Sequence, residues 1–411
     1  MAIETTEPRD TERKRMRYLW LTWTDPKPEC DGQRIYSGRL IDAVAEAGAD
    51  IDVLCFVSDG SPRRYGVVEG RVHWWPVMRE SRPNWASVFS PLPNIAYRCD
   101  TSETRSAFWQ LISEQSWDAV VLDGLYSGWA LPLIKRLGRV WGRQPRVIYV
   151  SHNHEESTRA SVASNYKGNT LARYALSHDA MKARALEHRL VRQSDLVTAI
   201  TPEDAERFVI QWPGKPVAVL SPGYAGKRVP QRILTQDLPR RVVLVGSFEW
   251  VAKRINLEEF LTVADPLFAA VGAQLQIVGN GQPAHIESLR KRMHATELVG
   301  HVAAIEPYLA EARIAVVPER VGGGFKLKVL DYVFNRLPVA ALNGSMAGTP
   351  LRAPETCLSF DNVEDLANGV IRVLDDLPYL NRLQESAYAV CVDQFDWRNR
   401  GEQFLVQTAA A

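Results

Sequence analysis

The sequence has few cysteines and no arrangement of them that would bind a metal or crosslink the chain. Among its 411 residues, five scattered cysteines occur, with no C-x-x-C pair: Cys30, Cys55, Cys99, Cys357 and Cys391. Zinc sites and disulfide frameworks use paired or regularly spaced cysteines. We therefore expect neither, and this cysteine usage is typical of a reducing compartment.

Long apolar runs are also missing. A membrane-spanning helix needs about 20 consecutive apolar residues, and no run in the sequence approaches that length. The opening residues, MAIETTEPRDTERKRMR, are polar and charged and lack the apolar core of a secretory signal. We expect a cytoplasmic protein in which residues 1–16 form a solvated tail.

No excess of one charge is present. Lys and Arg number 49 against 48 Asp and Glu, a formal charge of +1. Proteins that bind nucleic acid through the phosphate backbone need a concentrated basic surface. The balance therefore argues against nucleic acid as a partner.

Short apolar runs rich in β-branched residues alternate with helical patterns along the first half of the chain. The expected strands begin near Tyr18, Ile51, Trp117, Arg146, Asp195 and Pro216. Runs of this kind are typical of buried parallel strands. Residues 17–222 are therefore predicted to form one doubly wound α/β domain.

Residues 223–240 interrupt the pattern with Gly, Pro and charged residues, and are predicted to be an interdomain linker. A second strand–helix series follows in residues 241–394. The predicted fold is α/β, with two Rossmann-like domains facing each other. Ligands of such sheets bind at the carboxyl ends of the strands, here in the cleft between the domains.

The segment from Val316 to Leu342 carries the strongest chemical signal. A strand is expected to end at Pro318, a glycine run follows, and a helix is expected to open at Phe325. Consecutive glycines allow backbone amides to approach an anion, and a helix N-terminus favours negative charge. We expect a diphosphate to bind at Gly322, Gly323, Gly324, Phe325, Lys326 and Lys328. Asp331, one turn further on, is placed to accept from ribose hydroxyls; the alternative is a tight turn with solvated lysines.

This segment resembles the donor site of GT-B glycosyltransferases in retaining family four. One branch of that family reads G-G-G-[TF]-[RK]-L-K-[IV]-L-[ED], which residues 322–331 match closely. Residues 246–250 (GSFEW), followed by Asn256, resemble the branch's G-S-M-D-W and the Asn after it. The resemblance implies a two-domain enzyme that takes a sugar from a nucleotide-diphosphate donor, with retention of configuration and no bound metal. No cofactor is expected beside the donor.

Two family positions differ in this chain. Gly323 stands where most members carry the first of two glutamates, and Ser247 stands for a diphosphate-binding arginine. Lys253 and Arg254 lie nearby at a shifted spacing, so the charge role is assigned to Lys326 and Lys328. Ser247 remains a candidate diphosphate contact.

The resemblance also implies contacts for the rest of the donor. Gly279 ends a strand as the family's V-G-x-G does, and the backbone around His301 and Val302 would recognise the base. A simple turn is the alternative for Gly279. Residues 395–411 resemble the family's closing helix, which crosses back to the first domain.

Candidates in the first half lie at predicted strand ends. SHNHEES, residues 151–157, resembles the family's H-N-x-E segment, and His152 is expected to face the cleft as a catalytic or sugar-binding residue. His154 is the weaker candidate of the two, with a surface pair as its alternative. Asp123 ends another strand and is expected to line the cleft and bind hydroxyls, or to cap the next helix. Gly32, in an Asp-Gly pair before a helix, would approach the donor's phosphate or sugar, or form an ordinary turn.

The predicted function is transfer of a sugar to an acceptor hydroxyl, by a hexosyltransferase that takes part in polysaccharide or glycoconjugate synthesis. The acceptor can be a sugar, a lipid-linked molecule or a small molecule. Residues 73–85, HWWPVMRESRPNW, combine aromatics with arginines and are a candidate for acceptor or weak membrane-surface contact. Two alternatives remain open: a sugar-nucleotide hydrolase or epimerase of the same shape, and a non-catalytic partner subunit.

Overall fold

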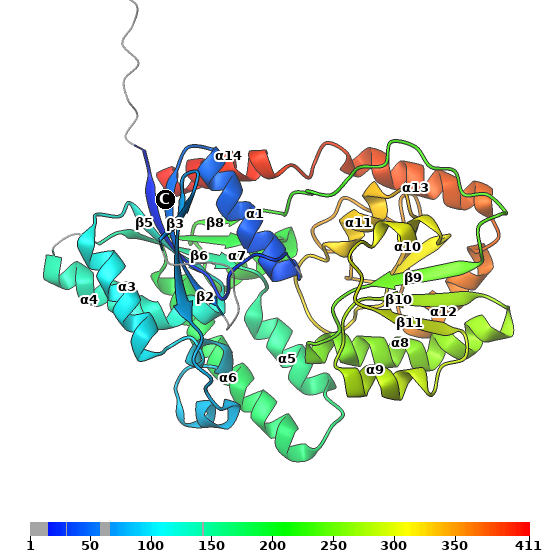
Figure 1. Cartoon of the computed structure of the whole chain (residues 1–411), viewed down its shortest axis with the longest axis horizontal. Coiled ribbons are helices and arrows are strands. Elements are labelled where there is room, and N and C mark those ends of the chain that lie inside the picture. The colour runs from blue at the N-terminus through cyan, green and yellow to red at the C-terminus, as the bar shows by residue number, and fades with distance from the viewer. Residues whose placement is uncertain (1–14, 30, 58–65, 142–143) are drawn as a thin grey trace, which may run out of the picture.

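The computed structural model describes residues 15–29, 31–57, 66–141 and 144–411, and within it the chain forms two α/β halves side by side (Figure 1). The fold is the one predicted, with two Rossmann-like parallel sheets. Residues 1–14 of the expected tail, and Cys30, lie outside the described residues, while Met16 packs against the core of the first half. No helix in the described part of the chain is long and apolar enough to cross a membrane.

The first half is built on an eight-stranded sheet in the order β3-β4-β2-β1-β5-β6-β7-β8. Its strands are β1 (Arg17–Leu21), β2 (Asp50–Val57), β3 (Val67–Glu69), β4 (Val72–Met78), β5 (Ala119–Asp123), β6 (Arg146–Ser151), β7 (Leu196–Ala199) and β8 (Val217–Val219). All neighbours are parallel except β3, which pairs antiparallel with β4. The order changes direction at β1 and β5, and that switch point opens toward the second half.

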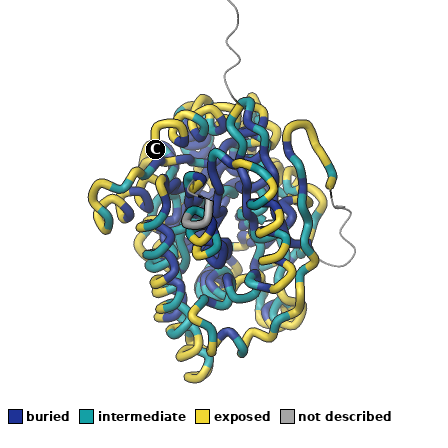
Figure 2. Tube along the Cα trace, turned by 90° about the vertical axis from the view of Figure 1, so that its left-hand side faces the viewer, coloured by how far each residue is buried: buried dark blue, intermediate teal, exposed yellow. Residues whose placement is uncertain are grey.

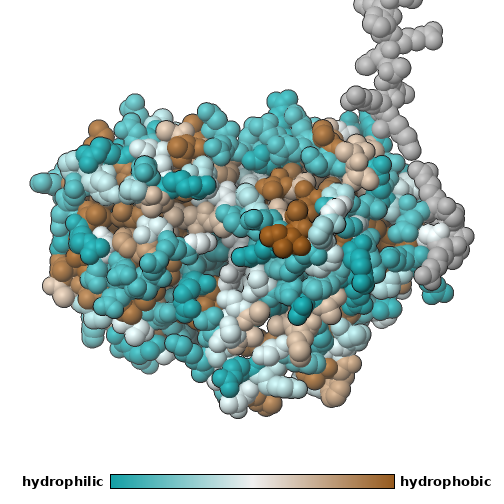
Figure 3. Space-filling view, turned by 180° about the vertical axis from the view of Figure 1, so that it is seen from behind, coloured by the Kyte–Doolittle hydropathy of each residue, from teal (hydrophilic) through white to brown (hydrophobic). Residues whose placement is uncertain are grey.

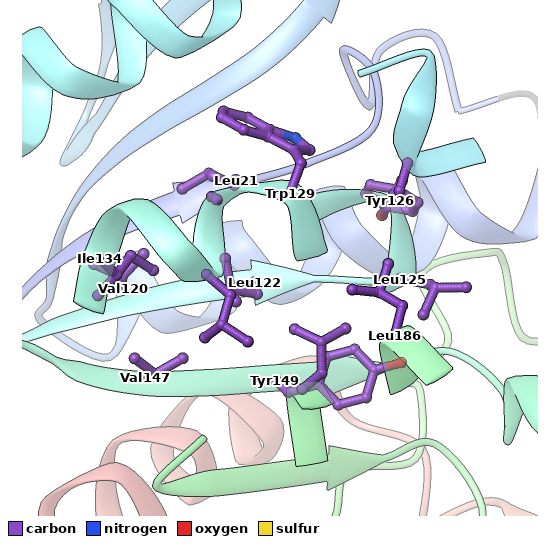
Figure 4. Packing of buried hydrophobic residues seen from close by; sticks show 14 of the residues in the cluster. Leu21, Val120, Leu122, Leu125, Tyr126, Trp129, Ile134, Val147, Tyr149 and Leu186 are labelled. Carbon is purple, nitrogen blue, oxygen red and sulfur yellow. The ribbon is translucent and has the colours of Figure 1, made fainter. Parts of the chain in front are cut away.

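Helices cover both faces of this sheet. They are α1 (Gly32–Glu46), α2 (Asn94–Tyr97), α3 (Ser102–Glu114), α4 (Leu131–Trp141), α5 (Glu155–Asn165), α6 (Thr170–Gln193) and α7 (Pro202–Gln211), with 3₁₀ helices η1 (Asn84–Phe89) and η2 (Leu125–Ala130). Successive residues of β1 point to opposite faces, so Leu19 and Leu21 join one core while Tyr18 and Trp20 join the other. Figure 4 shows the first core, where Leu122 and Tyr149 of the sheet pack below Trp129 of η2.

The second half contains a six-stranded parallel sheet in the order β11-β10-β9-β12-β13-β14. Its strands are β9 (Arg241–Val245), β10 (Gln274–Val278), β11 (Thr296–Gly300), β12 (Ile314–Val317), β13 (Val339–Leu342) and β14 (Leu358–Phe360). Its helices are α8 (Val251–Ala270), α9 (Pro283–Arg290), α10 (Glu306–Ala310), α11 (Lys328–Phe334), α12 (Val363–Val373) and α13 (Leu377–Cys391). The switch point lies between β9 and β12.

The last helix, α14 (Trp397–Ala410), lies against α1 of the first half (Figure 1). Phe404 is buried and packs on Tyr18 and Trp20, with ring centroids 5.7 and 5.4 Å apart. The approach is so close that a β-carbon on Gly401 would lie 2.0 Å from the carbonyl oxygen of Ala43. Figure 2 shows buried residues gathered in the interior and exposed ones on the outer turns and loops.

The local structure differs from the sequence-based description at two places. Strand β4 was missed, and part of the aromatic segment at residues 73–85 belongs to it: Trp74 is buried, and the Trp75 indole donates to Asp52 at 2.7 Å. Pro76 disguised the strand, but it lies beyond the three residues that pair with β3, so its missing N–H breaks no ladder there. The helix expected at Phe325 begins at Lys328 instead.

Candidate functional site

A cleft of about 790 Å³ lies between the carboxyl ends of the two sheets. Eleven of the predicted site residues line it: Gly32, His152, Ser247, Gly279, His301, Val302, Gly323, Phe325, Lys326, Lys328 and Asp331. These residues come from loops and helix starts that follow the carboxyl ends of the strands, where α/β proteins bind ligands. Three predicted residues, Asp123, Gly322 and Gly324, do not line the cleft.

The triple-glycine turn after β12 spans the gap between the two halves. Gly322 and Gly324 have φ angles of +112° and +70°, a region that favours glycine. A β-carbon on Gly323 would lie 2.3 Å from Oγ1 of Thr158, and one on Gly324 would lie 2.3 Å from Oδ1 of Asn153. A β-carbon on Gly322 would face Trp250 and Ala252, and neither Gly322 nor Gly324 lines the cleft, so a contact of their backbone with a diphosphate stays a prediction.

Three lysines that line this cleft surround one buried carboxylate. Glu319, directly after β12, forms ion pairs with Lys253 and with Lys328, the latter at 2.5 Å, and Lys326 lies 3.9 Å away. The Glu319 side chain is only 4% exposed. The Lys326 ammonium also donates to the carbonyl oxygens of Gly323 and Gly324 at 2.5 and 2.9 Å. Lys326 thus shapes the glycine turn as well as adding charge.

Burial and charge oppose each other in this cluster. Burial raises the pKa of Glu319, but the charges of Lys253, Lys328 and Lys326 more than offset it, so that pKa lies far below its ordinary value. Burial lowers the pKa of Lys326 to about 8, and the charge of Glu319 opposes this fall. Burial also lowers the pKa of Lys328 below its ordinary value, again against the charge of Glu319. The Glu319 carboxylate is therefore ionised at neutral pH, and its negative charge helps Lys326 and Lys328 to stay protonated.

Asp331 lies one turn into the same segment, at the edge of the cleft. Burial raises the pKa of Asp331 to about 7, and the charge of Glu306 acts in the same direction. The hydrogen bond with Tyr224 and the charge of Lys328 oppose this rise. A carboxyl group with this pKa can accept hydrogen bonds from the hydroxyl groups of a ligand when it is ionised, and donate to them when it is protonated.

Two glycines bring the ends of strands β9 and β10 close together where they border the cleft. Gly279 has a φ of +139°, and a β-carbon there would lie 1.7 Å from the carbonyl oxygen of Gly246. Only glycine allows β9 and β10 to approach so closely at their ends. His301 and Val302 follow β11 on the other side of Gly279, and Ser247 follows Gly246; all three line the cleft.

The first half contributes a histidine that is held by a buried carboxylate. His152 Nε2 lies 2.6 Å from Oδ1 of Asp123, and the indole of Trp20 donates to Oδ2 at 2.9 Å. Asp123 is fully buried, so the expectation that it lines the cleft and binds hydroxyls is wrong. Its carboxylate does not cap the next helix either, because both oxygens bond Trp20 and His152. The ring of His152 lies between Asp123 and the cleft.

Gly32 is the first residue of α1 and lines the cleft next to His152. Asp31 caps this helix by accepting from the backbone N–H of Arg34 at 2.9 Å. A β-carbon on Gly32 would make ordinary contact with Leu327 across the cleft, at 3.5 Å. The N-terminus of α1 is thus directed at the segment that carries the lysines.

Two family models match the chain. The model for glycosyl transferases group 1 matches residues 239–376, and the model for the glycosyl transferase 4-like domain matches residues 31–223. Together they span most of the chain and assign a transferase domain to each half. The chain belongs to the GT-B glycosyltransferases.

Solved structures share the fold of this GT-B glycosyltransferase. Sucrose-phosphate synthase from Thermosynechococcus elongatus superposes with a TM-score of 0.72 at 19% identity, over 97% of this chain and 100% of that one. HepE of Anabaena, solved with UDP and glucose, gives 0.63 at 13% identity, over 96% and 100%. Trehalose 6-phosphate synthase from Burkholderia multivorans gives 0.62 at 12% identity, over 96% and 98%. No curated protein sequence gives a significant match.

Sequence reasoning missed two charged residues at this glycosyltransferase's cleft. The spacing of Lys253 differs from the family's, yet Lys253 lines the cleft and pairs with Glu319. Glu319 lies buried behind the lysines. Its place directly after a buried strand, a few residues before two lysines, is the signal that could have found it.

Two polar residues near the site are structural. His154 is buried and caps α5, with its ring bonded to Ser157 and Gln211 at 2.9 and 3.0 Å. Glu187 accepts from the backbone N–H groups of Glu155 and Glu156, each at 2.8 Å, which fixes the start of the same helix. These bonds hold the segment after β6 that carries His152. Among the residues that the structure describes, no three His, Cys, Asp or Glu side chains gather as metal ligands would.

Proposed function

We propose that this glycosyltransferase takes a sugar from a nucleoside diphosphate donor and transfers it to an acceptor hydroxyl. The observation that carries the proposal is the lysine cluster of Lys253, Lys326 and Lys328, which lies in the same cleft as His152. Three ammonium groups and one carboxylate leave a net charge of +2. That charge complements a diphosphate, and HepE, which has the same fold, was solved with UDP and glucose.

The donor is proposed to lie along the second sheet. Its diphosphate would meet Lys253, Lys326, Lys328 and Ser247, its ribose would bond Asp331, and its base would lie on the backbone at Gly279, His301 and Val302. The sugar would then extend toward Gly32 and His152 on the opposite wall. Each of these residues lines the cleft.

We propose further that the reaction needs no metal ion and retains the anomeric configuration. The lysines supply the positive charge that would otherwise come from a divalent cation at a leaving diphosphate. Retention is supported by the resemblance of residues 322–331 to retaining family four. Activity should persist in EDTA, and proton NMR of the first product should show the donor's own anomeric configuration.

Hydrolysis or epimerisation of the donor is the second candidate, and the His152–Asp123 pair favours it. A histidine whose ring is held by a carboxylate is suited to remove a proton, from water as well as from an acceptor hydroxyl. A non-catalytic subunit would not need this pair together with a cationic cleft.

One assay separates these functions. The protein is incubated with UDP-, ADP- and GDP-sugars, and nucleotide release is measured with and without sugar, lipid-linked and small-molecule acceptors. Release that depends on an acceptor supports transfer, and release into water supports hydrolysis. Binding of a nucleotide sugar without release indicates a non-catalytic subunit, and absence of binding would sink the proposal.

Weak contact with a membrane surface is proposed for the first half, at a place other than the tryptophans of β4. The 3₁₀ helix η1 exposes Trp85 and Phe89, which are 69% and 84% exposed. Apolar side chains also gather at the lower end of the molecule seen from behind (Figure 3). Sedimentation with anionic vesicles should be reduced in a Trp85→Ser, Phe89→Ser variant; equal sedimentation of variant and wild type would contradict this contact.

A further inference from the structure

Glu319 is a buried carboxylate that lies behind the lysines of a cleft otherwise suited to an anion. Its oxygens meet the ammonium groups of Lys253 and Lys328, and Lys326 lies 3.9 Å away. A negative charge beside a diphosphate opposes binding if it acts alone. Its presence at this point therefore calls for a separate reason.

The reason lies in the behaviour of lysines in a buried site. Lysine carries a compact charge on a flexible stem, and it readily loses its proton when burial removes its water. Three such groups in one place also repel one another. Without a counter-charge, each would either lose its proton or move its ammonium group out to solvent.

The backbone around Glu319 is fixed by bonds from two other segments. The Asn256 amide oxygen accepts from the N–H groups of Arg320 and Val321 at 3.2 and 2.9 Å, and its nitrogen donates to the carbonyl of Val321 at 2.7 Å. The Ser345 hydroxyl donates to the carbonyl of Glu319 at 2.8 Å. The carboxylate therefore stands at a set position, and the lysines come to it.

We propose that Glu319 is a positioning residue of the donor site: its carboxylate gathers the ammonium groups of Lys253, Lys326 and Lys328 at the place where the donor's diphosphate binds, and keeps them charged before the donor arrives. This inference rests on the proposed function. Glu319 itself makes no bond to the donor and exchanges no proton with it. The carboxylate offsets one of the three ammonium charges, and the bound diphosphate then offsets the other two.

Other charged groups near the lysine cluster also affect the pKa values of its lysines. Asp204 of α7, across the cleft, raises the pKa of Lys326, and Asp331 raises that of Lys328. The charge of Glu319 contributes to the raised pKa of Tyr332, and the charge of Glu306 contributes to the raised pKa of Asp331. In both lysines the charge of Glu319 is the largest influence that raises the pKa, while burial and the other lysines lower it. Loss of the Glu319 charge should therefore shift both lysine titrations to lower pH.

The test is a Glu319→Gln variant, which keeps the shape and removes the charge. Affinity for the nucleoside diphosphate that binds wild type most tightly is measured by calorimetry from pH 6 to 9. An anion binds the protonated lysines, so wild-type affinity should fall above about pH 8, the pKa of Lys326. The variant should begin to fall about one pH unit lower. At pH 8 it should bind about tenfold more weakly than wild type, and at pH 6 within about threefold.

Two variants serve as controls, and each comparison is made with wild type at the same pH so that the titration of the nucleotide cancels. Glu319→Asp keeps the charge on a shorter stem and should keep the wild-type pH midpoint, even where affinity is lower. Glu258→Gln removes a half-exposed carboxylate from α8, the helix that also carries Lys253, and should change nothing. Thermal unfolding of each variant reports any loss of the fold.

A second readout needs no nucleotide. In protein labelled with ¹⁵N-lysine, Glu319→Gln should lower the pKa of cleft lysines in the free enzyme by about one unit, and Glu258→Gln should not. If wild type binds no nucleoside diphosphate, the proposed function fails, while this titration still decides whether Glu319 keeps the lysines charged. An unchanged pH midpoint in both measurements, or an equal loss of affinity at every pH together with a lower melting temperature, would overturn the inference.

Discussion

The imidazole of His152 and the carboxylate of Asp123 are 2.6 Å apart, and the carboxylate's second oxygen is bonded to Trp20. An ionised carboxylate can only accept, so Nε2 of His152 carries the hydrogen in this bond. The other ring nitrogen is then free to take a proton from a group in the cleft. Trp20 itself packs on Phe404 of α14, so the last helix supports the orientation of the histidine.

Replacement of Asp123 by Asn should reduce catalysis without reducing donor binding. The Asn oxygen can still accept from Trp20, but its amide nitrogen then faces His152 and forces the ring into the wrong tautomer. We expect kcat to fall about 10²-fold or more, in the range of general acid–base contributions. Nucleoside diphosphate affinity should stay within about threefold of wild type. A fall in affinity as large as the fall in kcat would show instead that the pair serves donor binding.

Replacement of Lys328 by Ala should weaken donor binding and leave the fold intact. A charge-assisted hydrogen bond contributes about 1.5–3 kcal/mol, so affinity for a nucleoside diphosphate should fall about 10- to 100-fold. The matched control is Lys291→Ala, which removes a lysine that is 75% exposed and lies outside the cleft. Calorimetry at pH 7 measures both. Unchanged affinity in Lys328→Ala would refute the placement of the diphosphate.

Most of the strands and the doubly wound class of each half were predictable, because apolar runs mark buried parallel strands. Strand β4 was hidden by Pro76 and by polar residues, which an edge region of the sheet tolerates. The triple-glycine turn was also predictable from the sequence, but the reason why glycine is needed there was not. Gly323 and Gly324 are needed because Thr158 and Asn153 of the other half approach them, a contact between segments far apart in the sequence.

The charged residues of the site were only partly predictable, again because some of their contacts join segments far apart in the sequence. Lys326, Lys328 and Asp331 lie in one short segment and could be read together. Lys253 joins Glu319 across 66 positions of the chain. Asp123 was found at a strand end, yet its burial depends on Trp20 and His152, which come from two other strands of the sheet or their ends. Spacing along the chain does not carry such information.

Glu187 should make the stability of the protein depend on pH. Burial raises the pKa of Glu187 from 4.5 to about 8, with the charge of Glu155 acting the same way and two backbone N–H groups opposing it. Between these pH values the folded state holds a proton that the unfolded state has lost. Its contribution to the free energy of unfolding is therefore full below about pH 4.5 and is lost as the pH rises toward 8.

The comparison is with Glu187→Gln, which has no proton to lose. Urea unfolding at pH 5, 6, 7 and 8 should show wild type losing stability relative to the variant by about 1.4 kcal/mol per pH unit at most. Other titrating groups are common to both proteins and cancel. A difference that stays constant with pH would mean that the two amide donors outweigh burial and keep Glu187 ionised throughout.

The contact between Gly323 and Thr158 should govern how the two halves close on the donor. In Gly323→Ala the new β-carbon would lie 2.3 Å from Oγ1 of Thr158, so either the turn or α5 must move. Overpacking of this kind costs about 1–3 kcal/mol, and we expect kcat/KM to fall about tenfold. Gly323 is not among the positive-φ glycines, so alanine should not strain the turn itself.

A second substitution separates this contact from the backbone of the turn. Thr158→Ala removes the hydroxyl that the new β-carbon would meet, and the β-carbon of residue 158 is then 3.5 Å away, an ordinary contact distance. Thr158→Ala alone should keep kcat/KM within about threefold of wild type, and the double variant should recover most of the loss caused by Gly323→Ala. The coupling between the two sites then measures the interdomain contact directly. If the double variant is as impaired as Gly323→Ala, the glycine is required for the conformation of the turn, and the contact with Thr158 has no part in closure.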